Sequence, residues 1–362
     1  MRLSVFEYAT IGQGGSPGQS LRDVLDLVRS AEQWGYHGYW FAEHHLGRGR
    51  AGAAPVVLSA LAAAATTRLD VGTAVSILPH HRPLALVEQI STIAEVHPGR
   101  VHLGIGKSLS HPDEPAADRL VSALDELAQP GAAVPELQIG DFPRLVKELL
   151  VVGDSTRDGY ERSVRQVLSL LTRPIATIDG HPLQAAPGLD APVTPWLFGL
   201  TSVESARHSA ALGLPYAVNQ HVSGHSLEEA VDVYRSEFRP SAFLDSPYLA
   251  CSVHALAAAT DGEAHRLAAD YPRWIAGVLH RGFSDHVGAP ADAALEAAAD
   301  QDRLRDAVGV RIVGEASEVV DRVREVADRV GADEVMVNTI VADSEAKARS
   351  YELIAKLWED HA

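Results

Sequence analysis

Short apolar runs alternate with amphipathic helical stretches along most of the chain, a pattern typical of repeated β-α units. An apolar run at 3–8 is followed by a glycine-rich turn and by a stretch at 20–34 with apolar residues at helical spacing. Further strands are predicted at 38–42, 69–77, 101–105, 195–200, 214–218, 249–257 and 334–340. Eight such strands favour a closed (β/α)8 TIM barrel, and the first strand lacks the Gly-x-Gly-x-x-Gly that follows it in a Rossmann fold.

The alternation breaks twice, at about 108–193 and 261–308, where only helix-like patches are visible. These stretches are predicted to be helical insertions after strands four and seven. Connections that follow barrel strands form the C-terminal rim, where barrel active sites lie. We expect the whole chain, 1–362, to form one barrel domain carrying both insertions at its rim.

A predicted helix at 54–65 is apolar on almost every side. A barrel helix of this kind must also be covered on its outer face. Either an insertion or a second subunit would do so, and we favour a homodimer.

Composition narrows the function. Hydrophobic residues make up 46% of the 362, enough for a large core, and 31 basic against 48 acidic residues give a net charge of −17. That field disfavours nucleic acid or an anionic membrane as a main partner. The single cysteine, Cys251, excludes an intramolecular disulfide and a cysteine-rich zinc site. With no signal-peptide pattern and no run of ~18 apolar residues, we expect a cytoplasmic protein.

The clearest candidate chemistry is Glu43-His44-His45, directly after the second strand. An imidazole oriented by a carboxylate moves protons near neutral pH, and Glu43 is the nearest carboxylate in the sequence. A polar loop with hydrogen-bonded histidines is the plainer alternative. His80-His81 could add metal ligands, but adjacent histidines rarely share one ion and no His-x-x-x-His is present, so we expect no metal.

Two further segments end at the predicted rim. Gly104-Ile105-Gly106-Lys107 closes the fourth strand, where glycines admit a flat ligand and Lys107 offers a cation. Thr201-Ser202-Val203-Glu204-Ser205 opens a helix, and hydroxyls with free amides there suit a phosphate. A tight turn with a solvated lysine, and a capping box between Thr201 and Glu204, are the structural alternatives.

Together these residues resemble the bacterial luciferase-like flavin monooxygenase family. The similarity is densest over 35–107 and is weakest over 108–193 and 261–308. Its motifs are Trp40-Phe41-Ala42-Glu43-His44-His45, Pro55, Val71-Gly72-Thr73-Ala74-Val75, Leu78-Pro79, Pro83, Pro98-Gly99-Arg100, Leu103-Gly104-Ile105-Gly106, Ser202-Val203-Glu204-Ser205-Ala206, Gly213-Leu214-Pro215, Gly314 and Gly331-Ala332-Asp333-Glu334.

The resemblance implies reduced FMN across the C-terminal mouth of the barrel. His44 aligns with the histidine that handles protons of the flavin C4a-hydroperoxide, with Glu43 and His45 beside it. Ala74-Val75 aligns with a cis peptide against which the flavin ring packs. Its phosphate site corresponds to Lys107, where luciferase has arginine, and to Leu200, Thr201, Ser202 and Ser205. Gly106 replaces luciferase's reactive cysteine, which removes the thiol and leaves more room at the ring.

The function so implied is a monooxygenase that takes reduced FMN from a separate reductase and uses O2. Hydroxylation, epoxidation or Baeyer–Villiger oxygenation of a small apolar molecule would follow. Because sequences of this family include tailoring enzymes for aromatic polyketides, the resemblance also implies a secondary metabolite of that kind, in antibiotic biosynthesis, as the substrate.

Two alternatives remain at this stage. One is an F420-dependent hydride-transfer enzyme, for which Arg48 and Arg50 would be the additional basic residues. The other is a flavin-binding relative without catalytic activity, against which the intact Glu43-His44-His45 counts.

Overall fold

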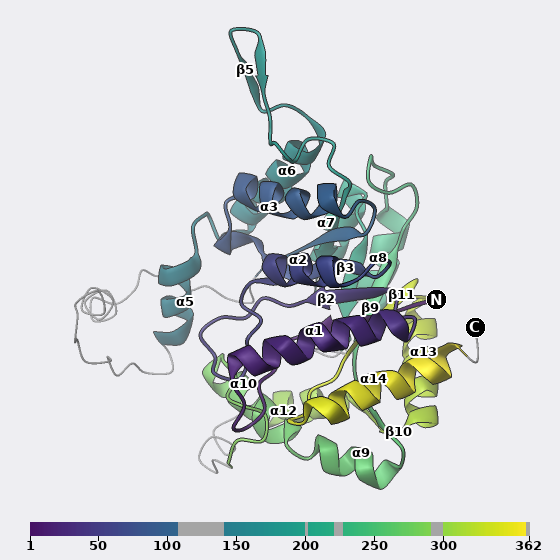
Figure 1. Cartoon of the computed structure of the whole chain (residues 1–362). Helices are drawn as coiled ribbons and strands as arrows, with labels where there is room; N and C mark the ends of the chain where they lie inside the picture. Colours follow the sequence, from purple (N-terminus) through teal and green to yellow (C-terminus); the bar gives the residue numbers. More distant parts are fainter. Residues whose placement is uncertain (108–140, 200–201, 221–226, 291–299, 360–362) are drawn as a thin grey trace, which may run out of the picture.

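A computed structural model describes residues 1–107, 141–199, 202–220, 227–290 and 300–359 (Figure 1). Eight parallel strands form its centre. They are β1 (Arg2–Glu7), β2 (Gly38–Phe41), β3 (Asp70–Ile77), β4 (Val101–Gly106), β7 (Val193–Phe198), β8 (Tyr216–Asn219), β9 (Leu249–Ala258) and β11 (Glu334–Asn338). Neighbouring strands pair in the order β11-β1-β2-β3-β4-β7-β8, and β9 pairs with both β8 and β11. The predicted closed barrel is therefore confirmed.

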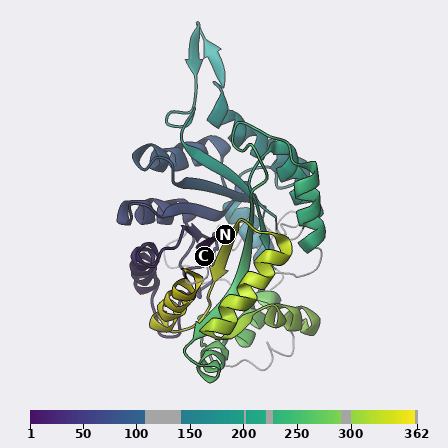
Figure 2. The ribbon, with the colours of Figure 1, turned by 90° about the vertical axis from the view of Figure 1, so that its right-hand side faces the viewer.

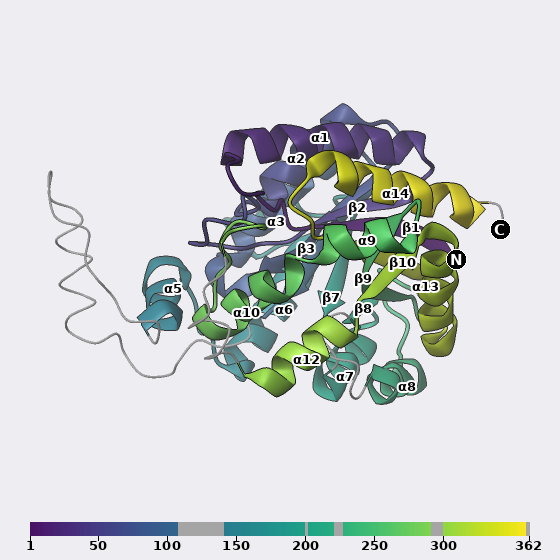
Figure 3. The same ribbon diagram turned by 90° about the horizontal axis from the view of Figure 1, so that it is seen from below.

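Helices surround the strands, as Figure 3 shows from below. Those that follow the barrel strands are α1 (Pro17–Gln33), α2 (Pro55–Ala65), α3 (Pro83–Val96), α7 (Val203–Leu212), α8 (Leu227–Glu237), α13 (Ala316–Val330) and α14 (Ser344–Glu359). Their ends follow local chemistry. Ser16 caps α1 by accepting a hydrogen bond from the Gln19 amide, and α13 ends at Gly331 in the left-handed conformation. Among the described residues no helix is long and apolar enough to span a bilayer.

The first insertion differs from the prediction. It contains α5 (Phe142–Leu150) and α6 (Arg157–Thr172), but also an antiparallel hairpin, β5 (Ala176–Ile178) with β6 (His181–Leu183). The expectation of helices alone is therefore wrong. Three-residue strands are too short to show an apolar alternation, although the intervening Asp-Gly is a hairpin signal.

The second insertion is largely helical where it is described, apart from the segment 282–290. It comprises α9 (Asp261–Ala268), α10 (Tyr271–Arg281) and α12 (Gln301–Gly309). A short strand that the pattern does not predict, β10 (Ile312–Glu315), then pairs in parallel with β9. It escapes prediction because it is only four residues long and includes a glycine.

The barrel interior is filled by aromatic and small side chains. One buried cluster contains Phe6, Trp40, Ala42, Ala74, Trp196, Phe198, Ala217, Ala250 and Met336, with Tyr8 and Val75 packed against it. A separate, larger cluster lies between the strands and the outer helices. The interior is thus a packed core, and an active site is expected at the rim above it.

The outer face of α2 carries exposed apolar side chains. Val57 is 58% and Leu61 47% exposed, four residues apart and so on one face of the helix. No described element covers this face, which fits the expectation of a second subunit without testing it.

Candidate active site at the barrel mouth

Four adjacent strands place the candidate residues at one rim. The strands β1, β2, β3 and β4 are consecutive neighbours in the barrel and run in parallel, so their C-terminal ends meet. Tyr8 follows β1, Glu43 and His44 follow β2, and Lys107 follows β4. The rim that the sequence predicts to be catalytic therefore gathers these side chains from separate parts of the chain.

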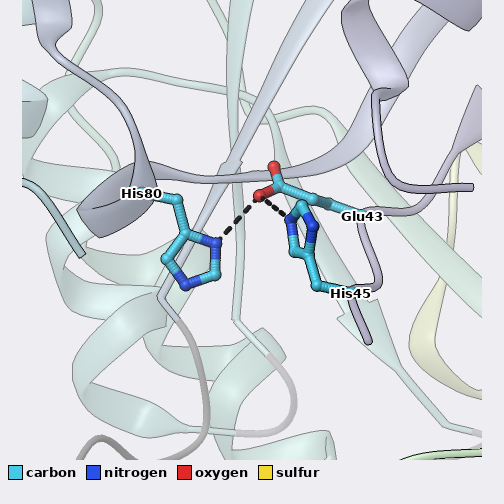
Figure 4. Close-up of side chains that lie close together, drawn as sticks. All are labelled: Glu43, His45 and His80. Atoms are coloured by element: carbon cyan, nitrogen blue, oxygen red, sulfur yellow. Dashed lines mark hydrogen bonds and ion pairs between the residues drawn. The ribbon is translucent and has the colours of Figure 1, made fainter. Parts of the chain in front are cut away.

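Glu43 is the hub of a compact hydrogen-bond network. Its buried carboxylate accepts hydrogen bonds through Oε1 from His45 Nε2 and His80 Nδ1, each at 2.9 Å (Figure 4). Through Oε2 it accepts two more at 2.9 Å, from His81 Nε2 and from the backbone amide of Ile77. One carboxylate thus ties the end of β2 to the turn that follows β3.

These contacts determine the charge of Glu43. Burial alone would raise its pKa, but the hydrogen bonds from His45, His80 and His81 hold the pKa well below the usual range. The carboxylate is therefore ionised and can only accept hydrogen bonds. Each of the three histidine nitrogens facing it must carry a proton, which fixes the tautomer of each neutral ring.

The expectation that Glu43 orients His44 is wrong. The side chains of adjacent residues at the end of a strand diverge, and Glu43 faces His45, His80 and His81 instead. His44 is half-buried, and its ring packs edge-to-face on Tyr8 with centroids 4.9 Å apart. Its Nδ1 is buried and has no hydrogen-bond partner in the part of the chain that the structure describes.

His44 is held in its neutral form. Burial is the main cause, and the positive charge of Arg50 acts in the same direction, so that the pKa lies well below the usual value despite the opposing charge of Glu43. A neutral imidazole with an unpartnered buried nitrogen is suited to accept a proton or a hydrogen bond from a bound molecule.

Arg50 is enclosed by aromatic side chains that are distant from it in the sequence. Its guanidinium lies between two aromatic rings, 4.9 Å from the centroid of Tyr8 and 4.8 Å from that of Trp274. Burial lowers its pKa to about 10, so it remains a cation at neutral pH. Tyr8 and Trp274 are site residues that sequence reasoning missed. The place of Tyr8 directly after the first strand could have identified it.

The second insertion reaches this rim through a short segment. Gly49 donates from its amide to the Ser284 carbonyl at 3.1 Å, and Arg48 pairs with Asp285 at 2.7 Å. On the other side, Gln13 donates to the carbonyl of Val287 at 2.8 Å. The loop carrying Glu43 and His44 is therefore fixed between the first strand's loop and the insertion.

The backbone of β3 is irregular where the resemblance predicts it. The peptide between Ala74 and Val75 is cis, as expected, and the register with β4 shifts between Thr73 and Ser76. The expected extra room at Gly106 is not present. A Cβ there would lie 2.6 Å from Cγ2 of Val75, so the Val75 side chain occupies that space.

The predicted phosphate end is described in part. Lys107 is exposed at the end of β4, and Ser202 is the N-cap of α7, accepting from the Ser205 amide at 3.4 Å. Leu200 and Thr201 lie outside the described residues. The capping box predicted between Thr201 and Glu204 therefore also lies partly outside the described residues, and the Glu204 carboxylate pairs with Arg157 at 2.7 Å.

The ion pair between Arg157 and Glu204 reduces the negative charge near the start of α7. Sequence alone suggests that Glu204 would repel a phosphate, but Arg157 at the start of α6 offsets its charge. Arg157 has no local sequence signal because it lies in the insertion, 47 residues from Glu204. It is a second basic residue near this end of the site.

Glu43, His45 and His80 also form a donor set that a divalent metal could use, since their ligand atoms lie within 4.8 Å of one another. The sequence argument paired adjacent histidines, whereas the structure brings together one from each loop. Hydrogen bonding accounts for the observed distances without an ion, and the expectation of no metal stays a prediction.

Comparison with known proteins gives the family. A profile described as luciferase-like monooxygenase matches residues 1–334. A protein named luciferase-like monooxygenase from Escherichia coli K12 is 32% identical, covering 99% of this chain and 97% of that protein. The crystal structure of apo-MsnO8 has a TM-score of 0.76 at 28% identity, covering 99% of this chain and 98% of its own.

Two more distant structures show the fold alone. The oxygenating constituent of 3,6-diketocamphane monooxygenase from Pseudomonas putida, a type II Baeyer–Villiger enzyme in complex with FMN, has a TM-score of 0.64 at 17% identity. An F420-dependent secondary alcohol dehydrogenase has a TM-score of 0.60 at 13% identity, and each covers 98% of this chain and 97% of its own. With a family profile over most of its length and a near full-length relative, this chain belongs to the luciferase-like monooxygenases.

Proposed function

We propose that the protein is a two-component monooxygenase that binds reduced FMN from a separate reductase and uses O2. The observation that carries this proposal is His44, a neutral imidazole whose buried Nδ1 lacks a partner among the described residues, at the barrel mouth of a luciferase-like fold. In this proposal His44 holds or transfers a proton at the reacting end of the cofactor.

The residues present fit an FMN. Its ring would lie against Ala74 and Val75 beside His44, while Lys107, Ser202 and Ser205 would hold its phosphate. Leu200 and Thr201 are proposed for the same phosphate site. A lysine and the N-terminus of α7 offer a cation and free backbone amides, which is what a phosphate requires. When bound, FMN supplies the redox and oxygen chemistry, and the protein supplies position and proton control.

The Glu43 network has a supporting part in the proposal. By fixing His45, His80 and His81, it holds two rim loops in one arrangement beside His44. Gly106 keeps Val75 in contact with β4 on the opposite side. Glu43, His45 and Gly106 are thus assigned to positioning the site.

The substrate is proposed to be a small apolar organic molecule. Tyr8 packs in one cluster with Trp274 and other apolar residues of α10, and this cluster brings apolar surface to the rim. Hydroxylation, epoxidation and Baeyer–Villiger insertion are the reactions to examine, with secondary metabolites of the aromatic polyketide type as first substrates. We also propose that the chain acts as one domain and assembles as a homodimer, to whose interface the exposed face of α2 contributes.

F420 is the second candidate cofactor, because an F420-dependent enzyme shares the fold. The structure supports FMN over it. Arg48, one of two cations available for the longer acidic tail, is neutralised by Asp285, and Arg50 is enclosed by Tyr8 and Trp274. A non-catalytic flavin-binding relative is less well supported, since it would have no use for the neutral His44.

Anaerobic binding titrations test the cofactor and its phosphate site. Reduced FMN should bind the native protein more tightly than reduced F420 does. Lys107→Ala should weaken the binding of reduced FMN by about tenfold, because one charge-assisted contact with the phosphate is lost. It should leave the binding of reduced riboflavin unchanged, because riboflavin has no phosphate. Tighter binding of F420 than of FMN, or an equal loss of affinity for FMN and riboflavin in Lys107→Ala, would contradict the assignment.

A further inference from the structure

The hairpin of the first insertion stands away from the body of the molecule. Figures 1 and 2 show β5 and β6 projecting beyond α6, and all six of their residues are exposed. Its turn is Asp179-Gly180, with positive φ angles of 50° and 81° that suit this dipeptide in a tight hairpin. A two-stranded hairpin without further packing is marginally stable in water, so this one needs a surface to pack on.

One face of the hairpin is apolar. In the antiparallel register, Ala176 pairs with Leu183 and Ile178 with His181, and paired residues lie on the same face. That face therefore presents Ala176, Ile178 and Leu183 together with the ring of His181, and Ile178 is 59% exposed. Three apolar side chains on one face of an exposed arm are typical of a binding surface.

A groove suited to this arm lies at the arm's own base. It has a volume of about 800 Å³, lies between the start of α3 and the end of α6, and includes apolar Leu84, Leu170 and Ile175. Four arginines also line it, and no carboxylate does. Two of these, Arg82 and Arg173, have no acidic partner among the described residues, although the chain as a whole carries a net charge of −17.

Charge complementarity identifies the occupant. The tip of the arm carries Asp179, whose carboxylate likewise has no basic partner in the described ranges. The arm points away from its own groove, so the two cannot meet within one chain. A two-fold interface uses the same patch on both copies, so the tip of one arm and the groove at the base of the other can lie against each other across it.

We propose that this hairpin is an exchange arm that docks in the groove between α3 and α6 of a second copy of the chain. Asp179 then faces Arg82 and Arg173 of the other copy, and Ile178 and Leu183 cover its Leu84. The inference does not rest on the monooxygenase proposal, since it concerns assembly and uses no residue of the barrel mouth.

Sedimentation equilibrium on the full chain tests the arm. The native protein should have twice the 38.7 kDa mass of one chain. Asp179→Asn retains a residue that tolerates positive φ but removes the charge, and should weaken the dimer by about tenfold. Arg173→Gln should do the same, and the double variant should lose little more than either single variant because both remove one interaction. Asp245→Asn, an exposed aspartate outside the groove, is the matched control.

A cross-link distinguishes the arm from any other dimer surface. Cys251 is buried, so a cysteine introduced on the surface is the accessible thiol of a variant chain. Mixing Ile178→Cys with Leu84→Cys chains under mild oxidation should give a covalent dimer in higher yield than either alone. A monomeric native protein, or a dimer that neither Asp179→Asn nor Arg173→Gln weakens and that gives no mixed cross-link, would overturn the proposal.

Discussion

Glu43 accepts four hydrogen bonds with two oxygens and makes the rim loops after β2 and β3 one unit. Glutamine is nearly the same shape but places an amide where Oε2 accepts. That amide would face the Ile77 N–H and the Nε2–H of His81, donor against donor, so two of the four hydrogen bonds are lost. Replacing this one oxygen by an amide nitrogen should therefore destabilise the folded chain.

We expect Glu43→Gln to lower the free energy of unfolding by about 3 kcal/mol at pH 7, as for a broken buried ionic contact. The pKa of Glu43 is lower in the folded chain than its ordinary value of about 4.3, so the stability it contributes is complete above that pH and falls as the pH drops below it. Stability measured by urea denaturation should therefore begin to converge for native and variant protein below about pH 5 and continue to converge as the pH falls further. The exposed Glu318→Gln on α13 should change stability by less than about 0.5 kcal/mol.

Arg50 acts on His44 through its charge. Replacing it by methionine removes the second cause of the low His44 pKa, so that pKa should rise, although burial will still keep it below the usual value. NMR titration of the histidine ring signals measures this directly. The arginine's contacts with Tyr8 and Trp274 are also lost, at a cost of about 1–2 kcal/mol. An unchanged His44 titration in a folded Arg50→Met protein would show that the two groups are not coupled.

Among single residues, His44 could be identified from its place directly after a strand, and the cis peptide at Ala74-Val75 from the family resemblance alone. It could not give the partners of Glu43, because His80 and His81 come from another loop. Their meeting depends on the register of β2 against β3, which is a property of the closed barrel rather than of any local pattern.

The loop between β2 and α2 is the element on which the site depends. Its residues 47–50 lie directly against the second insertion, and Gly49 is in contact with the carbonyl of Asp285. A Cβ at this position has no space, because the neighbouring atom belongs to the backbone and cannot rotate away. The glycine is therefore needed for the close approach of the two segments.

Gly49→Ala should destabilise the protein by about 1–3 kcal/mol and increase amide hydrogen exchange at 284–287. Gly309→Ala, at the end of α12, meets nothing within 4 Å and is the matched control, with little or no change expected. Equal protection of 284–287 in native and Gly49→Ala protein would show that this contact does not hold the insertion.

The barrel strands and the helices between them could be predicted from the sequence, because their apolar residues recur at a regular spacing. The strands that escaped prediction are β5, β6 and β10, each three or four residues long. Strands of that length contain too few alternating positions to be distinguished from a loop. Their positions are determined by tertiary pairing, as with β10 on β9.

On the scale of the whole molecule, exposed apolar residues collect on α2 and on the hairpin arm. Val57→Glu and Leu61→Glu place a charge on the uncovered face of α2. If this face is buried between subunits, each change should shift the protein towards the monomer in sedimentation, with unaltered circular dichroism. Val96→Glu, which also replaces an exposed apolar residue but on α3, serves as the comparison. A dimer unaffected by both α2 variants would remove α2 from the interface.

A stopped-flow experiment measures what His44 does during the reaction of the bound flavin with oxygen. The protein is mixed anaerobically with photoreduced FMN and then with oxygenated buffer. The native protein should show a transient absorbance near ~380 nm before oxidised flavin appears. In His44→Ala this transient should form more slowly or decay at least about tenfold faster. The exposed His265→Ala should match the native protein. If His44→Ala behaves as the native protein does, or if FMN in the native protein reoxidises as it does in free solution, the account is wrong.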